Sequence, residues 1–232
     1  MRDGNHIGLK FSPERSLVHT EKGSAAALEW HDEFTSPAIK SKEYDLMVDE
    51  VGTQGHTNIF SFDLLSRQGC DFLINLAEAK GGWTRNRHEN YPTMDMLIED
   101  IGMKEAYDNF ILKEFVCPAA NHLWKLEGSK WKPSNCTAET FLVKYDTTQQ
   151  SHLSLHHDAA NYTCVVALND DFEGGGTYFD RQKLLLRGKV GGATLHPGEI
   201  THRHGARTVT EGGVRIFVCF IGSVCSYFFH SQ

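Results

Sequence analysis

From about residue 137 onward, the chain consists of short β-prone runs separated by turns. Seven runs rich in β-branched and aromatic residues follow one another, and glycine- or aspartate-containing turns separate them at intervals of roughly 8–12 residues. In sequence letters the runs are TFLVKY, HLSLHHD, YTCVVALN, GTYFD, KLLLRG, ATLHPG and VRIFVCFIG. This spacing is typical of an antiparallel β-sandwich or barrel.

The preceding stretch has mostly helical periodicity. NIFSF at 58–62 predicts a short strand, and a helix should follow it, beginning at Asp63 or Ser66 and ending at Gly81 and Gly82. Residues 103–125 repeat the helical pattern, although Pro118 is expected to kink or break that run.

Together these patterns predict an α+β fold. We expect a double-stranded β-helix (jelly roll) with helices packed on one sheet, mainly from the N-terminal half of the chain. Residues 1–56 are polar and weakly periodic, so we expect a partly irregular N-terminal extension there. Residues 57–232 should then form the main domain, because the chain is long enough for one large domain and 40% of its residues are hydrophobic.

Composition excludes several classes of protein. The net charge of -7 argues against a nucleic-acid-binding surface, which needs clustered basic residues. No apolar run reaches the length of a membrane span, and the first residues lack the apolar core of a secretory leader. The six cysteines show no C-x-x-C spacing, which excludes zinc-ribbon and thioredoxin-like sites. We expect most of them to be buried thiols and leave disulfides undecided.

The stretch LSLHHDAANYT at 153–163 carries the strongest chemical signal. In an extended strand His156 and Asp158 project from one face, whereas His157 projects from the other. Two histidines and one carboxylate on one side of an iron ion form the site of the non-haem Fe(II) oxygenases. Zinc could take the same ligands, but no H-E-x-x-H motif accompanies them. An isolated His-x-Asp is more often a capped strand start at the surface, so further residues must support the site.

The third ligand should come from LHPGEITHRHGARTV. His196 lies in a turn signal, H-P-G, which favours a structural role. His202 and His204 would share one strand face if this segment is extended, so alternation does not separate them.

Arg215 opens the apolar run of the last strand. A partly buried guanidinium needs an anion, and its planar fork suits a small dicarboxylate. The alternatives are an arginine that reaches solvent at the strand end, or an internal salt bridge. FEGGGTYF at 172–179 predicts a hairpin or bulge, or a close approach of the backbone to a pocket.

These features resemble the C-terminal catalytic domain of the procollagen lysyl hydroxylases, which are Fe(II)/2-oxoglutarate oxygenases. The resemblance is sharpest in FLVKYDTTQQSHLSLHHDAANYTCVVALN, in FEGGGTYF and in LHPGEITHRHGARTVTEGGVRIFVCF. It extends to EWHDEF, NIFSFDLLS and PTMDMLIEDIG (92–102) in the first half.

The resemblance implies roles for individual residues. The iron ligands of the family fall on His156, Asp158 and His204, which selects His204 over His202. The arginine that binds 2-oxoglutarate falls on Arg215. Tyr145 and Thr163, on neighbouring predicted strands, are candidates to line the 2-oxoglutarate pocket, although packing is the commoner role of a core tyrosine.

The chain departs from the family pattern in three places. The spacing from His204 to Arg215 is one residue longer than expected. Val165 stands where the family has an asparagine. The stretch between GGGTYF and LHPG is shorter, so loops on the substrate side should differ.

The implied function is hydroxylation of protein side chains, most simply lysyl residues in collagen-like sequences. Fe(II), 2-oxoglutarate and O2 are the implied cofactor and cosubstrates, ascorbate is the reductant, and the cosubstrate is decarboxylated to succinate and CO2. The implied partners are a peptide or protein substrate and a second copy in a homodimer. The compartment would be the endoplasmic reticulum for a piece of a longer lysyl hydroxylase, or the cytoplasm for a complete chain.

Three other functions compete with this one. The same chemistry on prolyl residues or another substrate is the nearest. A non-catalytic jelly-roll binding module is a rival from another class. A cupin-like small-molecule or storage protein is a third, without support from the helical first half.

Overall fold

The computed structural model describes residues 32–52, 56–88, 90–126 and 132–223. Its helical elements are η2 Ile39–Ser41, α2 Tyr44–Met47, α3 Arg67–Lys80, α4 Lys104–Tyr107, the π-helix η3 Asp108–Val116, α5 Cys117–Trp124, η5 Pro133–Asn135 and η6 Ile200–His202. Its strands are β1 Asp49–Glu50, β2 Phe60–Asp63, β3 Met94–Leu97, β4 Cys136–Asp146, β5 Leu153–His156, β6 Tyr162–Ala167, β7 Phe172–Gly174, β8 Thr177–Phe179, β9 Leu184–Leu186, β10 Gly192–Pro197, β11 His204–Ala206 and β12 Val209–Ser223.

The strands form two antiparallel sheets. The larger sheet has the order β1-β2-β10-β6-β12-β4-β3, and β7 also pairs with β12. The smaller sheet has the order β5-β11-β8-β9. Neighbours in the sheets are often far apart in sequence, which is expected when a chain passes repeatedly between two layers. The predicted mixture of helices and antiparallel sheets is therefore confirmed.

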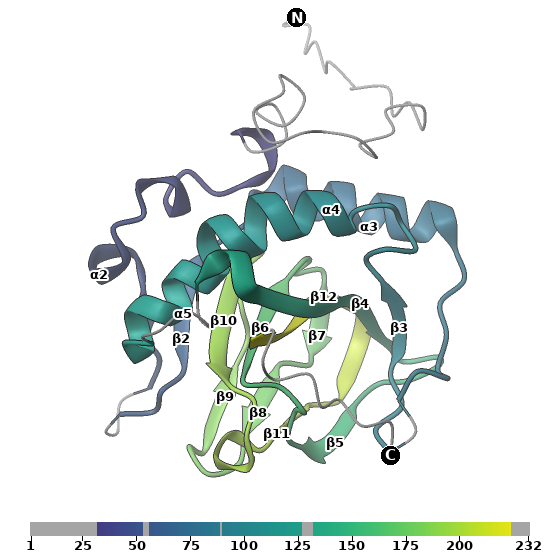
Figure 1. Cartoon of the computed structure of the whole chain (residues 1–232). Helices are drawn as coiled ribbons and strands as arrows, with labels where there is room; N and C mark the ends of the chain where they lie inside the picture. Colours follow the sequence, from purple (N-terminus) through teal and green to yellow (C-terminus); the bar gives the residue numbers. More distant parts are fainter. Residues whose placement is uncertain (1–31, 53–55, 89, 127–131, 224–232) are drawn as a thin grey trace, which may run out of the picture.

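Helices cover the outer face of the larger sheet. In Figure 1, α3, α4 and α5 lie together along one side of the molecule, and β5, β8, β9 and β11 lie away from them. The helical side chains pack with Leu195, Phe217 and Cys219 of the sheet in one continuous apolar core. Helix α3 begins and ends close to the predicted positions. The Ser66 hydroxyl accepts a hydrogen bond from the N–H of Gly69, and Gly81 ends the helix with a positive φ of 64°.

Of the two predicted effects of Pro118, a break in the second helical run is wrong, whereas a kink stays a prediction. Residues 104–124 form one uninterrupted run in which α4, the π-helix η3 and α5 follow directly on one another. Pro118 stands in the first turn of α5, where hydrogen bonding changes from the π to the α pattern. A proline is tolerated in such a first turn because its missing N–H is not required there.

A second, smaller core fills the space between the two sheets. It contains Phe141, Val143 and Tyr145 of β4 and Val214 and Val218 of β12. Leu153 of β5 and Ala206 of β11 contact this core from the smaller sheet. The side chains of β12 therefore alternate between the two cores, as a strand with both faces covered requires.

The N-terminal part joins the larger sheet before residue 57. Asp49 and Glu50 pair with β2 as an edge strand, while residues 1–31 lie outside the described residues. The division at residue 56 stays a prediction. The five cysteines in the described ranges are buried and free, and Cys225 lies outside those ranges. No helix among the described residues is both long enough and apolar enough to span a membrane.

Candidate metal centre

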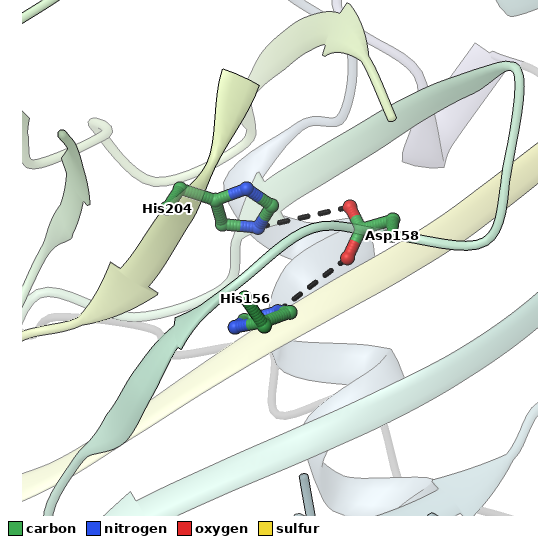
Figure 2. Close-up of side chains that lie close together, drawn as sticks. All are labelled: His156, Asp158 and His204. Carbon is green, nitrogen blue, oxygen red and sulfur yellow. Dashed lines mark ion pairs between the residues drawn. The ribbon is translucent and has the colours of Figure 1, made fainter. Parts of the chain in front are cut away.

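His156, Asp158 and His204 converge at one end of the space between the sheets. One potential ligand atom from each residue lies within 4.8 Å of the other two. Figure 2 shows both imidazoles on the same side of the carboxylate, each joined by a dashed line to a different oxygen. The distance from His156 Nε2 to Asp158 Oδ1 is 3.4 Å, and that from His204 Nε2 to Asp158 Oδ2 is 3.7 Å.

Strand pairing brings the two histidines together. His156 ends β5, and it lies directly opposite His204, the first residue of β11. Their ring centroids are 4.6 Å apart. Asp158 follows the end of β5, so its orientation comes from the turn rather than from strand alternation alone. Its N–H donates to the carbonyl oxygen of Gly198, 2.9 Å away, while His157 is exposed.

Hydrogen bonds to the backbone determine the tautomers of both rings. His156 Nδ1 lies 2.9 Å from the carbonyl oxygen of Ser154, and His204 Nδ1 lies 2.9 Å from that of His202. A carbonyl oxygen can only accept, so each neutral ring carries its proton on Nδ1. The Nε2 lone pairs are therefore directed toward Asp158, which is the arrangement that a metal-binding histidine requires.

Thr163 of β6 orients the carboxylate. Its hydroxyl donates to Asp158 Oδ2 at 2.6 Å, and both side chains are buried. Burial opposes ionisation of Asp158, but His156, His204 and this hydroxyl hold the pKa of the carboxyl group below its usual range. Asp158 is thus a carboxylate at neutral pH and supplies a negatively charged oxygen ligand.

The two imidazoles differ in their electrostatics. Burial lowers the pKa of His156, but the neighbouring Asp158 outweighs this effect and raises it overall. His204 is more deeply enclosed, and burial together with the nearby His156 lowers its pKa. The three groups form a buried donor set of two nitrogens and one carboxylate, which suits a divalent metal ion such as Fe(II).

His202 is not part of this group. It ends the turn η6, so it does not share a strand face with His204. Its Nε2 lies 2.9 Å from the carbonyl oxygen of Thr57, and its Nδ1 lies 3.0 Å from the Thr201 hydroxyl. Both of its nitrogens are thus used in structural hydrogen bonds.

Arg215 does not reach the group, contrary to the sequence prediction. Its side chain lies on the helix-covered face of β12, where Nη2 is 2.9 Å and Nε is 3.0 Å from Glu78 Oε1 of α3. The preceding residue, Val214, faces the space between the sheets instead. The extra residue between His204 and Arg215 explains the difference, because a shift of one residue along a strand exchanges its two faces. The alternative of an internal salt bridge is the correct one.

Tyr145 of β4 and Thr163 of β6 both face the space between the sheets, but β12 lies between their strands, so the prediction that these strands are neighbours is wrong. Tyr145 is 4% exposed and packs in the core between the sheets. Burial raises the pKa of its phenol well above the usual range, and the charges of Asp95 and Asp158 raise it further. The tyrosine is therefore neutral and within the electrostatic influence of the metal centre.

The sequence did not predict a cluster of aromatic and basic side chains beside the metal centre, formed by Arg87, His88 and Tyr91. The ring of Tyr91 lies 5.2 Å from that of His156, and the ring of His88 lies 5.3 Å from that of Phe141. Arg87 covers Phe141, with its Cζ 4.9 Å from the ring centroid, and its Nη1 binds the fully buried Asp95 at 2.8 Å. The stretch PTMDM that holds Asp95 contributed to the family resemblance, but it has no residue pattern that marks a site.

Comparison with solved structures identifies the fold. The chain is similar to a prolyl 4-hydroxylase structure from Phytophthora capsici with a TM-score of 0.52 and 11% identity, covering 90% of this chain and 69% of that chain. A prolyl 4-hydroxylase from Pseudomonas putida gives a TM-score of 0.50 and 10% identity, covering 72% of this chain and 92% of that chain. These likenesses show the fold alone; together with the His-Asp-His group, the sequence relatives described next place the chain in the class of Fe(II)/2-oxoglutarate-dependent oxygenases.

Sequence comparison narrows the class. The procollagen lysyl hydroxylase and glycosyltransferase of Acanthamoeba polyphaga mimivirus is 30% identical over 205 residues, covering 82% of this chain and 22% of the relative. The multifunctional procollagen lysine hydroxylase and glycosyltransferase LH3 of Rattus norvegicus is 33% identical over 177 residues, covering 71% of this chain and 23% of the relative. The chain belongs to the procollagen lysyl hydroxylase family. It spans about a quarter of the length of these relatives, and no protein-family model matches it.

Proposed function

We propose that this chain is the catalytic part of an Fe(II)- and 2-oxoglutarate-dependent hydroxylase that modifies lysyl side chains in collagen-like protein chains. The observation that carries the proposal is the convergence of two imidazole Nε2 atoms and one carboxylate at His156, His204 and Asp158. The relatives named procollagen lysine hydroxylase support the choice of lysine and of a collagen-like substrate.

The donor set fits iron. His156, Asp158 and His204 would hold the ion, and three protein ligands leave further positions for exchangeable ones. When bound, iron, 2-oxoglutarate and O2 supply the oxidising chemistry, with release of succinate and CO2 and with ascorbate as reductant. The protein's own contribution is to orient the ligands. The Ser154 and His202 carbonyls hold the two rings, and Thr163 holds Asp158.

The fit of 2-oxoglutarate is less complete. Tyr145 and Thr163 lie on the inner wall and are proposed to line its pocket, but Val214 occupies the position at which an inward arginine was expected. The Arg87 side chain is positively charged and lies against Phe141 on the same inner sheet face. Its two terminal nitrogens already form ion pairs with Asp95 and Glu139. No residue is therefore assigned to the far carboxylate of the cosubstrate.

The remaining parts of the proposal concern architecture and partners. The two facing antiparallel sheets are proposed to be the halves of a double-stranded β-helix. Residues 57–232 are proposed to be the dioxygenase domain, with the residues before them as an extension that adds β1 to its sheet. The partners are a protein substrate and a second copy of the chain in a homodimer.

The test is anaerobic titration of the full chain with Fe(II), followed by addition of O2, 2-oxoglutarate and matched peptides that contain either lysine or proline. Stoichiometric Fe(II) binding, succinate release and a mass gain of one oxygen atom on the lysine peptide are expected. Oxygen transfer to the proline peptide alone would replace lysyl with prolyl specificity.

The same experiment separates the enzyme from a binding module. Fe(II) binding without succinate formation, with or without peptide, would support a non-catalytic jelly-roll module that uses metal structurally. Absence of Fe(II) binding would contradict the metal centre itself.

A further inference from the structure

A histidine next to the metal centre has one nitrogen without a protein partner. His196, near the end of β10, is fully buried, and its Nε2 makes no hydrogen bond with any of the described residues. Buried polar side-chain atoms are nearly always hydrogen-bonded in folded proteins. An unpartnered one beside a donor set therefore requires an explanation.

The other nitrogen of the ring determines what Nε2 can do. His196 Nδ1 lies 2.8 Å from the carbonyl oxygen of Pro197. Because that oxygen can only accept, Nδ1 carries the proton of the neutral ring, and Nε2 presents a lone pair. Nε2 is thus a buried acceptor.

The position of the ring limits the available donors. In the pairing of β10 with β6, His196 lies directly opposite Thr163, whose hydroxyl already donates to Asp158. The His196 ring contacts that of His204 edge-on, with centroids 4.9 Å apart. His204 has its proton on Nδ1, bound to a backbone carbonyl, and the carboxylate has none. These three neighbours cannot donate to His196 Nε2.

We propose that His196 Nε2 accepts a hydrogen bond from a water molecule bound to the metal ion, and that His196 is a positioning residue for that water. His196 is not one of the residues whose ligand atoms lie within 4.8 Å of one another, so the proposal assigns it to bound water rather than to the ion. The inference rests on the proposed metal site, but not on the identity of the protein substrate.

Mn(II) is a suitable probe, because it accepts the same nitrogen and oxygen ligands and is paramagnetic. Its binding to the full chain is measured by electron paramagnetic resonance, and water-proton relaxation reports the number and exchange rate of water molecules on the bound ion. We compare the wild-type chain with His196→Phe, which keeps a ring but removes the acceptor, and with His196→Gln, which restores an oxygen acceptor.

One lost hydrogen bond should speed exchange of the bound water in His196→Phe by about two- to tenfold, or release the water altogether. His196→Gln should restore most of the wild-type value. His122→Phe is the control, since this histidine lies on α5, where its Nε2 binds Asp45, and it should leave water exchange unchanged. Thermal unfolding shows whether each variant folds, and His196→Met replaces His196→Phe if the latter does not.

The outcomes are distinguishable. Wild-type Mn(II) binding with unchanged water exchange in His196→Phe would overturn this inference alone. Equal changes in the Phe and Gln variants would also overturn it, because they would indicate a packing role. If Mn(II) and Fe(II) both failed to bind the wild-type chain, the metal centre would be wrong, and this inference with it.

Discussion

The inner and outer faces of β12 have different surroundings, although their residues alternate along one strand. Val214, Ile216 and Val218 face the space between the sheets that leads to the metal centre. Arg215 and Phe217 face the helices, where the arginine pairs with Glu78. Arg215 is an arginine only one position away from the inner face of β12, yet it does not contribute to the metal centre. One position along the strand decides whether a guanidinium reaches the cavity or the helix layer.

The largest loss of metal binding is expected from substitution of Asp158, which lies between the two sheets. Asp158→Ala removes the charged ligand that both imidazoles face, so metal binding and Fe(II)-dependent turnover should fall below detection. Isothermal titration with Fe(II) under anaerobic conditions measures the binding. The exposed neighbour His157 provides the control, and His157→Ala should bind metal normally. Metal binding retained by Asp158→Ala would remove Asp158 from the site.

The two buried histidines of the η6–β11 segment provide a second comparison. His204→Ala should abolish metal binding, whereas His202→Ala should retain it and lose only folding stability, because His202 hydrogen-bonds Thr57 and Thr201. Metal titration and chemical denaturation of both variants measure the two effects. A greater loss of metal affinity in His202→Ala would mean that the wrong histidine is assigned.

Thr163→Val tests the hydrogen bond that orients the carboxylate. The substitution keeps the volume of the side chain but removes the donor to Asp158, and metal affinity should fall by about 10- to 100-fold, as for other groups that orient ligands. Thr140→Val is the matched control, since this buried threonine points from β4 to the outer face. Equal losses in both variants would indicate general loosening of the sheet.

His196 should make the stability of the metal-free protein depend on pH. Its pKa is 6.5 in the unfolded chain and about 3 in the folded one, because burial disfavours the charged ring. Between these values only the unfolded state binds the proton, so stability is lost as pH falls from about 6.5 to 3, by about 1.4 kcal/mol per pH unit. Urea unfolding of wild type and His196→Phe across this range should give a flatter profile for the variant. Parallel profiles would contradict the assignment.

Arg215 should show the smallest effect. Its ion pair with Glu78 is partly exposed, with side-chain exposures of 22% and 41%, so Arg215→Leu should cost at most about 1 kcal/mol of stability. The 2-oxoglutarate concentration needed for half-maximal turnover should hardly change. A double-mutant cycle with Glu78→Gln should show that the two effects are not additive. A large rise in the 2-oxoglutarate requirement would restore the arginine to the cosubstrate site.

Local patterns predicted much of this molecule correctly. The run of short strands, the helix capped by Ser66 and the pairing of helices with an antiparallel sheet all follow from periodicity and turn residues. His156 and Asp158 were also predictable, because their separation of two residues is a local property. The resemblance selected His204, and its pairing opposite His156 agrees with that selection.

Other features depend on contacts between distant segments. The side of β12 on which Arg215 lies depends on how the irregular pairing near Val209 and Glu211 absorbs one extra residue. The cluster of Arg87, His88 and Tyr91 exists only because the loop before β3 lies against Phe141 in the middle of β4 and His156 at the end of β5.

The sequence by itself determined the kinds of element and the ligand types, since these depend on residue chemistry and short-range spacing. Only the tertiary structure decided which side chains face the inner space, because strand register and burial are set by long-range packing. Only the tertiary structure shows that Nε2 of His196 is buried without a hydrogen-bond partner among the described residues, because the H-P-G turn signal carries no information about the residues packed around the imidazole.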